Sequence, residues 1–309
     1  MSIPRLILDV DTGHDDAVAI MMAAHNPAID LCAITVTAGN QTLDKTLVNT
    51  LHVCSALSID VPVYAGMSRP LLSPLVTASK IHGESGLDGP VFPPCNKKEE
   101  KEHAVVFLVN TIMKHPAKQF TIVATGPLTN IAMALRLEPS IAHKIARLLI
   151  MGGSMTQGNV TAQAEFNIHA DPEAASIVFD SGIMPVMVGL DVTRALVLTR
   201  ERLDLLSQIK GPAASIFSAS MEHYMAACLQ YIGESPAMHD PLCVALAADP
   251  SLCQTKKYFV GVECSGALTR GRTVVDLSGV SQKAPNAEVA LTIDEKRFWA
   301  MLEATLQRY

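Results

Sequence analysis

Residues 6–17 read Leu6-Ile7-Leu8-Asp9-Val10-Asp11-Thr12-Gly13-His14-Asp15-Asp16-Ala17, and this stretch decides the fold. Its apolar start predicts a buried strand, and Gly13 predicts a turn. The apolar run from Ala17 to Ala24 then predicts a buried helix. The single strand-to-helix connection carries four carboxylates: Asp9, Asp11, Asp15 and Asp16.

Four negative charges at close range repel one another, so such a cluster is best explained by a cation among them. A hard divalent cation with oxygen ligands is the simplest candidate. The alternative is that Asp15 and Asp16 only cap the helix and interact with its positive end. Capping accounts for two of the carboxylates but not for all four, and we therefore prefer the metal hypothesis.

Composition excludes several classes of protein. The net charge of −6 and the lack of a long basic run argue against a nucleic-acid surface. No uninterrupted apolar run reaches the roughly 18 residues of a membrane helix, and the N-terminus resembles no secretory signal. The seven cysteines are odd in number, scattered and without a C-x-x-C pair. This usage predicts reduced core thiols and a cytoplasmic location.

Strand and helix patterns alternate along the chain. After the first strand, further strands are expected at 31–37, 61–65, 120–125, 148–151, 185–190, 258–263 and 287–293. Helices are expected at 103–113, 130–137, 200–231, 239–248 and 294–307, with others starting near Thr42 and Asp171. This alternation predicts an α/β fold, with an open, mostly parallel, Rossmann-like sheet flanked by helices.

In such sheets ligands bind beyond the carboxyl ends of the strands. The notable polar side chains lie at those ends, namely Asp9, Asp11, Asn40 and Thr125. Gly152 and Gly153, after a later strand, would let a ligand approach the backbone closely. We therefore expect the active site at the C-terminal ends of the strands.

Asp11, Asp16 and the distant Asp240 could share a cation with backbone carbonyls. One carboxylate could then accept a proton from metal-bound water, whose pKa the metal lowers. Asp240 precedes Pro241, so a simple helix cap is the alternative for this residue.

Two of the ten histidines are singled out, His82 in a Gly-rich loop and His239 beside an acid. A histidine at either place could protonate a leaving group, although a packing role stays open for both. The segment Glu165-Phe166-Asn167 lies in a polar loop and suits either a sugar with several hydroxyls or an ordinary turn. The sequence contains no nucleophile elbow, Walker loop or G-x-G-x-x-G.

The pattern Asp9-x-Asp11-x-Gly13-x-Asp15-Asp16-Ala17 resembles the N-terminal signature of the nucleoside hydrolases, metal-dependent enzymes that split the N-glycosidic bond of ribonucleosides. Other matching motifs follow in the family's order along nearly the whole chain. They are Ala38-Gly39-Asn40, His82-Gly83-Glu84-Ser85-Gly86, Thr125-Gly126-Pro127-Leu128-Thr129-Asn130, Met151-Gly152-Gly153, Glu165-Phe166-Asn167, Asp171-Pro172-Glu173-Ala174-Ala175 and His239-Asp240-Pro241. Within the inosine-uridine-preferring type, the chain most resembles the pyrimidine- or uridine-preferring branch, which carries both loop histidines.

The resemblance implies a role for each matching residue. The implied Ca²⁺ ligands are Asp11, Asp16, the backbone carbonyl of Thr125, and Asp240. Asp11 would also be the general base, His82 and His239 would assist departure of the base, and Asp9 would support the site from behind. The implied substrate-binding residues are Asp15, Asn40, Glu165 and Asn167 on the ribose hydroxyls, with Met151, Asn159 and Phe166 nearby.

The resemblance also implies a single nucleoside hydrolase domain over residues 1–309, acting in nucleoside salvage on pyrimidine nucleosides, with purine activity open. It implies a homodimer or homotetramer with no nucleic-acid or membrane partner. Two departures are visible. Thr12 stands where the family usually has Pro, which would loosen the turn without removing a ligand, and the match is weak over Ala227–Tyr231, where pyrimidine-preferring members place base-contacting side chains. The second departure leaves the base preference open.

Parts of the sequence also fit two other classes of function. Leu8-Asp9-Val10-Asp11-Thr12-Gly13 also fits the start of the haloacid dehalogenase-type phosphatases, with Asp9 as nucleophile, Asp11 as acid/base and Mg²⁺ as cofactor. That class needs a later G-D-x-x-x-D motif, which the chain lacks. A non-catalytic nucleoside- or sugar-binding protein is the other alternative. Intact Asp11, Asp16 and Asp240 count against it, because a binder needs no activated water.

Overall fold

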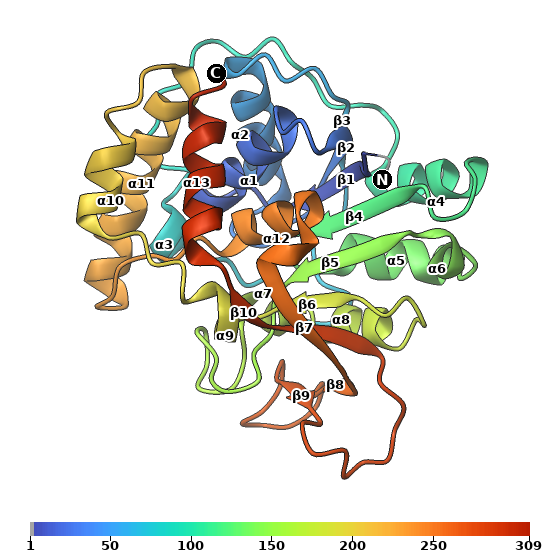
Figure 1. Ribbon diagram of the computed structural model, residues 1–309. Coiled ribbons are helices and arrows are strands. Elements are labelled where there is room, and N and C mark those ends of the chain that lie inside the picture. Colours follow the sequence, from blue (N-terminus) through green and yellow to red (C-terminus); the bar gives the residue numbers. More distant parts are fainter. Residues whose placement is uncertain (1–2) are drawn as a thin grey trace.

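An eight-stranded sheet forms the centre of the computed structural model, which describes residues 3–309 (Figure 1). Its strand order is β3-β2-β1-β4-β5-β6-β10-β7, and all neighbours are parallel except β10 and β7. The strands of this sheet are β1 (Arg5–Val10), β2 (Asp30–Val36), β3 (Val63–Ala65), β4 (Phe120–Ala124), β5 (Arg147–Met151), β6 (Val186–Val188), β7 (Cys253–Tyr258) and β10 (Ala287–Ile293). The predicted α/β fold with a mostly parallel sheet is confirmed.

Helices cover both faces of the sheet. The α-helices are α1 (His14–Ala24), α2 (Leu43–Ala56), α3 (Ser79–His82), α4 (Ala104–Lys114), α5 (Thr129–Leu137), α6 (Ile141–Lys144), α7 (Phe166–Ala170), α8 (Pro172–Phe179), α9 (Leu190–Thr193), α10 (Arg200–Leu206), α11 (Pro212–Tyr231), α12 (His239–Ala248) and α13 (Glu295–Leu306). Helices α1, α2 and α10–α13 pack on one face, and α4, α5, α6 and α8 on the other (Figure 1).

Strand β1 shows why helices pack on both faces of the sheet. Its side chains alternate between the faces, with Leu6, Leu8 and Val10 in one core and Ile7 in the other. A strand buried on both faces reads as a continuous apolar run, as this segment of the sequence does. Because β1 pairs with both β2 and β4, its carboxyl end lies at the middle of the sheet edge.

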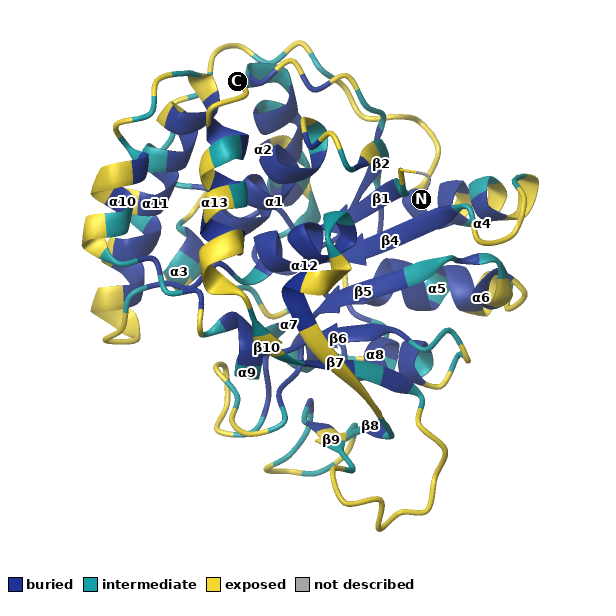
Figure 2. Cartoon of the chain, in the orientation of Figure 1, coloured by how far each residue is buried: buried dark blue, intermediate teal, exposed yellow. Residues whose placement is uncertain are grey.

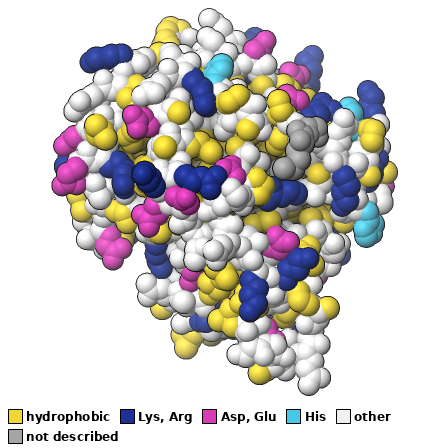
Figure 3. All heavy atoms as spheres, viewed as in Figure 1, with side chains coloured by type: hydrophobic (Ala, Val, Ile, Leu, Met, Phe, Trp, Pro, Cys, Tyr) yellow, Lys and Arg dark blue, Asp and Glu magenta, His cyan; other side chains and the backbone are white. Residues whose placement is uncertain are grey.

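A small two-stranded sheet, β8 (Val260–Val262) with β9 (Thr273–Val275), lies apart from the central sheet. The chain that follows it, residues 277–285, is exposed throughout (Figure 2). On the face in Figure 3 basic and acidic side chains are interspersed with apolar ones. Within residues 3–309 no helix is both long and apolar enough to cross a bilayer.

The sequence analysis missed some boundaries. Helix α1 begins at His14, not at Ala17, so the carboxylates of Asp15 and Asp16 belong to its first turn. Strand β7 was missed because its Gln-Thr-Lys-Lys segment is polar, which suits the exposed edge of a sheet. Strand β9 was also missed, whereas residues 200–231 are largely helical as expected and form the two helices α10 and α11. That residues 1–309 form a single domain stays a prediction, supported by one sheet whose strands span residues 5–293.

Candidate active site

A cavity of about 600 Å³ opens at the carboxyl ends of the central strands. Its lining includes most residues predicted for the site: Asp15, Asn40, His82, Thr125, Met151, Asn159, Glu165, Phe166, Asn167, His239 and Asp240. The other two predicted residues, Asp11 and Asp16, are buried beside these. The structure therefore brings the whole predicted set to one place.

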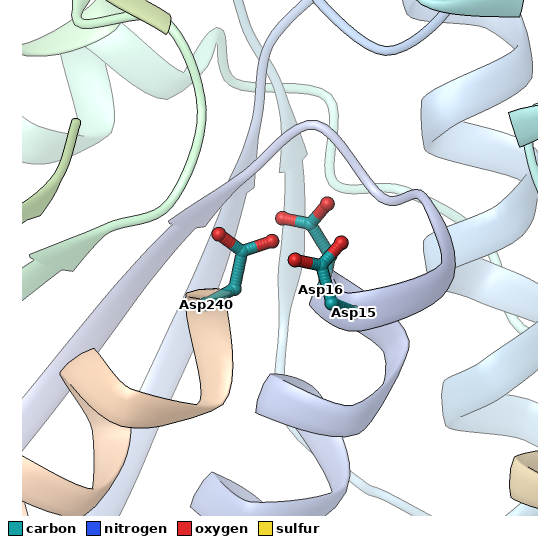
Figure 4. A group of neighbouring side chains, drawn as sticks. All are labelled: Asp15, Asp16 and Asp240. Carbon is teal, nitrogen blue, oxygen red and sulfur yellow. The ribbon is translucent and has the colours of Figure 1, made fainter. Parts of the chain in front are cut away.

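Three carboxylates converge at the bottom of this site (Figure 4). Asp15 and Asp16 come from the first turn of α1, and Asp240 comes from the first turn of α12. One oxygen atom of each lies within 4.8 Å of the others. Burial, with repulsion from Asp16, raises the pKa of Asp15 to about 7. Burial also raises the pKa of Asp240 well above its usual value, and Asp15 raises it further.

Asp11 lies next to this cluster and has one unpartnered oxygen. Its Oδ2 accepts the backbone N–H of Asn40 at 2.7 Å, whereas Oδ1 is buried with no hydrogen-bond partner among the described residues. Burial and repulsion from Asp16 raise the pKa of Asp11 well above its usual range. The backbone at Gly39 passes so close to Asp11 that a Cβ at residue 39 would lie 2.1 Å from Oδ2. An orphaned carboxylate oxygen beside three others is costly unless a proton or a cation compensates it.

Asp16 is the most tightly held carboxylate. Its Oδ2 accepts the backbone N–H of Gly13 at 3.0 Å and Nδ2 of Asn40 at 3.1 Å, and its Oδ1 accepts the hydroxyl of Thr125 at 2.7 Å. The carbonyl oxygen of Thr125, also a predicted ligand, accepts Nδ2 of Asn167 at 2.6 Å and retains a second lone pair. The residues predicted as ligands are all hard oxygen donors, as a divalent cation such as Ca²⁺ requires. The three carboxylates that converge most tightly differ from the predicted ligand set in one member. They include Asp15, which was predicted to bind the ribose, whereas Asp11, a predicted ligand, lies beside them.

Glu165 and Asn167 are fixed by the backbone around them. Glu165 was predicted in a loop, but it is the N-cap of α7, and its carboxylate accepts three backbone N–H groups, from Gly153, Asn167 and Ile168. Burial nonetheless raises its pKa. Nδ2 of Asn167 bridges the carbonyls of Thr125 and Met151, at the ends of β4 and β5, at 2.6 and 3.0 Å. Polar groups of fixed orientation therefore border the cavity.

The two predicted histidines both line the cavity and are both held through Nδ1. His239 has Nδ1 2.8 Å from the hydroxyl of Thr193, and burial lowers its pKa to about 4. His82 has Nδ1 3.0 Å from Nδ1 of His14, and burial lowers its pKa well below its usual value. Both rings are therefore neutral at neutral pH, each with Nε2 free of any partner in residues 3–309.

The sequence analysis associated residues 227–231 with the base only through the family resemblance and named no individual side chain of α11 as part of the site. Tyr224, Cys228, Tyr231 and Ile232 line the cavity, and the last two are 55% and 59% exposed. Helical periodicity indicates a buried face but not that its last turns border a cavity. His14 was missed although it lies inside the motif that identified the site.

Asp9 lies behind the site, as predicted. It is fully buried and outside the cavity lining, and its Oδ1 accepts both the hydroxyl of Thr35 at 2.5 Å and Nδ2 of Asn130 at 2.8 Å. A carboxylate in this position cannot attack a phosphate in the cavity. The phosphatase alternative, in which Asp9 is the nucleophile, is therefore wrong.

Comparisons with known proteins agree with this geometry. The model of the family described as inosine-uridine preferring nucleoside hydrolase matches residues 6–300. The pyrimidine-specific ribonucleoside hydrolase RihB of Escherichia coli is 45% identical over 306 residues, which cover 99% of this chain and 97% of RihB. RihB of Shigella flexneri matches to the same extent.

Solved structures show the same fold. A purine-preferring ribonucleoside hydrolase from Gardnerella vaginalis superposes with a TM-score of 0.91 at 33% identity, covering 99% of this chain and all of that one. The plant nucleoside hydrolase PpNRh1 gives a TM-score of 0.93 at 31% identity with full coverage of both chains. Fold and site define an enzyme that hydrolyses ribonucleosides. The chain belongs to the inosine-uridine preferring nucleoside hydrolase family.

Proposed function

We propose that the protein hydrolyses pyrimidine ribonucleosides, uridine and cytidine above all, to free base and ribose, and that it needs Ca²⁺ to do so. The observation that carries the proposal is the convergence of Asp15, Asp16 and Asp240 beside the unpartnered Oδ1 of Asp11. The pyrimidine preference is supported by the 45% identity to RihB, against 33% to the purine-preferring Gardnerella enzyme.

Asp11, Asp16, Asp240 and the carbonyl of Thr125 would hold the cation, with Asp15 close enough to contribute. Bound there, Ca²⁺ would compensate the clustered negative charge and make water in the site easier to deprotonate. Asp11 is the best general base, because Oδ1 is the one carboxylate oxygen of this cluster that is buried without a partner in the described chain. It would take a proton from the attacking water.

The remaining carboxylates and amides act on the ribose. Departure of the base leaves positive charge on the sugar ring, as in other glycosyl transfers. The carboxylates of Asp15 and Glu165 stabilise that positive charge, while Asn40 and Asn167 can hydrogen-bond the ribose hydroxyls. Because Glu165 and Asn167 are held by backbone groups and Asn40 by the carboxylate of Asp16, little reorganisation is needed when the charge develops.

His82 and His239 are proposed to act on the leaving base. A departing pyrimidine lacks the basic N7 of a purine, so its carbonyl oxygens and ring nitrogen need a donor nearby. Both histidines keep Nε2 free of partners within residues 3–309, and each is fixed through Nδ1. Each could therefore present an N–H to the base as the glycosidic bond breaks.

The test is a ribose-release assay with uridine, cytidine, inosine and adenosine, in Ca²⁺ and in excess chelator. We expect release from uridine and cytidine first, and its loss in chelator. Asp11→Asn should abolish turnover, whereas Asp44→Asn, an exposed carboxylate on α2, should not change it. Absence of release from all four nucleosides would overturn the proposed function, and full activity in chelator would overturn the metal requirement.

The wider role is also proposed. Release of free bases and ribose suits nucleoside salvage. A cytoplasmic location is supported by the seven cysteines, all within the described residues and all unpaired. Assembly as a homodimer or homotetramer is expected from the family resemblance, and sedimentation of the purified protein tests it.

A further inference from the structure

Helix α9 lies beside the cavity and presents two charged side chains that the mechanism above does not use. Leu190 and Val192 pack into the core, whereas Asp191 and Arg194, the residue directly after the helix, are half-buried. Residues three apart on a helix lie on the same side, so both side chains can reach the same neighbour. Neither forms an ion pair within residues 3–309, so their charged groups are available for other partners.

The neighbour that they share is the 154–164 loop, the residues that lead from β5 towards α7. Asp191 fixes the start of this loop. Its Oδ2 accepts the backbone N–H of Met155 and its Oδ1 accepts the hydroxyl of Thr156, both at 2.6 Å. The hydroxyl of Ser154 donates to the same Oδ1 at 3.4 Å. One carboxylate therefore binds three successive residues of the loop.

Arg194 holds the next two residues of the loop. Its Nη2 donates to the backbone carbonyl of Gly158 at 2.8 Å, and its Nη1 donates to that of Gln157 at 3.4 Å. In the part of the chain that the structure describes, Asp191 and Arg194 are the only side chains outside the loop that hydrogen-bond residues 155–158. Because a guanidinium carries several N–H donors in one plane, Arg194 is suited to bind two successive carbonyls.

Asn159 follows directly in the chain and lines the cavity. Its Oδ1 accepts the backbone N–H of Phe166 at 2.9 Å, between Glu165 and Asn167, which are proposed to act on the ribose. Asn159 therefore borders the ribose part of the cavity. Residues 159–162 are exposed, and an exposed segment with few buried contacts opens easily unless such hydrogen bonds hold it.

We propose that Asp191 and Arg194 are positioning residues that hold the 154–164 loop on α9, so that Asn159 is in place at the cavity before a nucleoside binds. This inference rests on the proposed function, in which the ribose binds beside Glu165 and Asn167. Without these hydrogen bonds only a fraction of the molecules has Asn159 in place, and the apparent affinity for substrate falls by that fraction. The bound complex is the same in both cases, so the rate at saturating substrate is kept.

Two variants test the proposal: Arg194→Met keeps the length of the side chain without its donors, and Asp191→Leu keeps the size without the acceptors. Each should raise KM for uridine about tenfold, the effect of a loop that is in place about one tenth of the time, and should leave kcat within about twofold. KM for 4-nitrophenyl β-D-ribofuranoside should rise equally, because the two substrates share the ribose. The two variants remove charges of opposite sign, so a direct effect of charge on the substrate would change KM in opposite directions.

Hydrogen exchange of the substrate-free protein measures the loop directly. The backbone N–H groups of residues 154–164 should exchange faster in both variants, while those of β1 keep their wild-type rates and show that the variants are folded. The matched control is Arg200→Met, because Arg200 pairs with Glu222 at 2.6 Å and lies outside the cavity lining. This control should change neither the exchange of the loop nor KM.

A double-variant cycle shows whether Arg194 acts through Asn159. In an Asn159→Ala background, adding Arg194→Met should raise KM no further. An additional rise of the size seen in the wild-type background would overturn the inference.

So would unchanged KM in a folded variant, opposite changes in the two variants, a rise for uridine alone, a loss in kcat alone, or wild-type exchange of the loop. If one of the two variants does not fold, the other decides by the same criteria. Failure of the proposed function is seen separately, because the wild-type protein would then release no ribose from uridine, whereas the exchange of the loop is measured without substrate.

Discussion

The two sides of the cavity are built in different ways. The carboxylate side, Asp11, Asp15, Asp16 and Asp240, is buried at strand ends and first helical turns. Backbone N–H groups fix Asp11 and Asp16. The base side, His82, Tyr224, Cys228, Tyr231, Ile232 and His239, combines buried rings with the exposed last turn of α11. Chemistry common to all ribonucleosides needs the first side, and the choice of base depends on the second. We therefore expect substitutions on the carboxylate side to change the rate for every substrate, and those on the base side to change the ranking of substrates.

The largest effect is expected at Asp11. Asp11→Asn removes the proposed base while keeping the size of the side chain and the acceptor for the Asn40 N–H. We predict a loss of about 10³- to 10⁴-fold in kcat, of equal size for uridine and inosine, from the magnitude of general base catalysis. Single-turnover assays at saturating substrate measure it. A loss restricted to one nucleoside would contradict the division between the two sides.

Asp9, directly behind the carboxylate side, tests how much stability the fold loses by burying a carboxylate. Burial raises the pKa of Asp9 from its ordinary value to about 7, although hydrogen bonds from Thr35 and Asn130 oppose the rise. The folded protein then binds more protons than the unfolded chain between about pH 4 and 7, so stability falls as pH rises through this window. In Asp9→Asn the part of this dependence that comes from Asp9 disappears, while the part that comes from the other buried carboxylates, such as Asp15, stays.

The expected difference is up to about 4 kcal/mol in unfolding free energy between the two ends of that range, at about 1.4 kcal/mol per pKa unit. Urea unfolding of both proteins in chelator, at several values of pH, measures it. Parallel pH profiles for the wild type and Asp9→Asn would show that Asp9 does not titrate in this window.

Glu165 has two roles, because it caps helix α7 and is also proposed to act on the ribose. Replacing it with Gln keeps the shape but turns one oxygen that accepts backbone N–H groups into a donor. We predict a loss of about 1 to 3 kcal/mol in stability from the disturbed cap of α7. We also predict a loss of about 10- to 100-fold in kcat/KM for all nucleosides. Thermal unfolding and steady-state kinetics separate the two effects, and a change in stability alone would remove Glu165 from the substrate contacts.

The smallest effect is expected at Tyr231, which is half exposed at the mouth of the cavity. Tyr231→Ala should leave stability within about 0.5 kcal/mol, as for most surface changes. It should change the ratio of kcat/KM for uridine over inosine by a few-fold. Unchanged ratios would place base selection in the buried part of the base side.

The same difference between the two sides explains which site residues could be predicted from the sequence and which could not. The carboxylate side was predictable because polar residues after buried strands must gather at one edge of a parallel sheet. Asp240 was a candidate ligand from the residues alone, with a helix cap as the alternative, and only the family match of His239-Asp240-Pro241 favoured the ligand role. Tyr224 was not predicted, because the packing of α11 against the loop around His82 depends on tertiary contacts.

Thr12 differs from the Pro that the family usually has, and contacts elsewhere in the fold compensate for the difference. The family resemblance suggests Pro at this place, and Thr12 was expected to loosen the turn before α1. In the structure its hydroxyl lies 2.6 Å from that of Thr50 on α2, and its carbonyl accepts Nδ2 of Asn49 at 3.1 Å. Contacts with a neighbouring helix therefore hold the turn, which no local pattern in the sequence could indicate.

Direct Ca²⁺ binding tests the central claim, that acids from the two ends of the chain hold one cation. Isothermal titration of the chelator-treated protein with Ca²⁺ at pH 7 should show one site per chain. Protons should be released on binding, because the buried carboxylates have raised pKa values. Asp240→Asn should weaken that site at least tenfold. Absence of binding, or unchanged affinity in Asp240→Asn, would contradict the account.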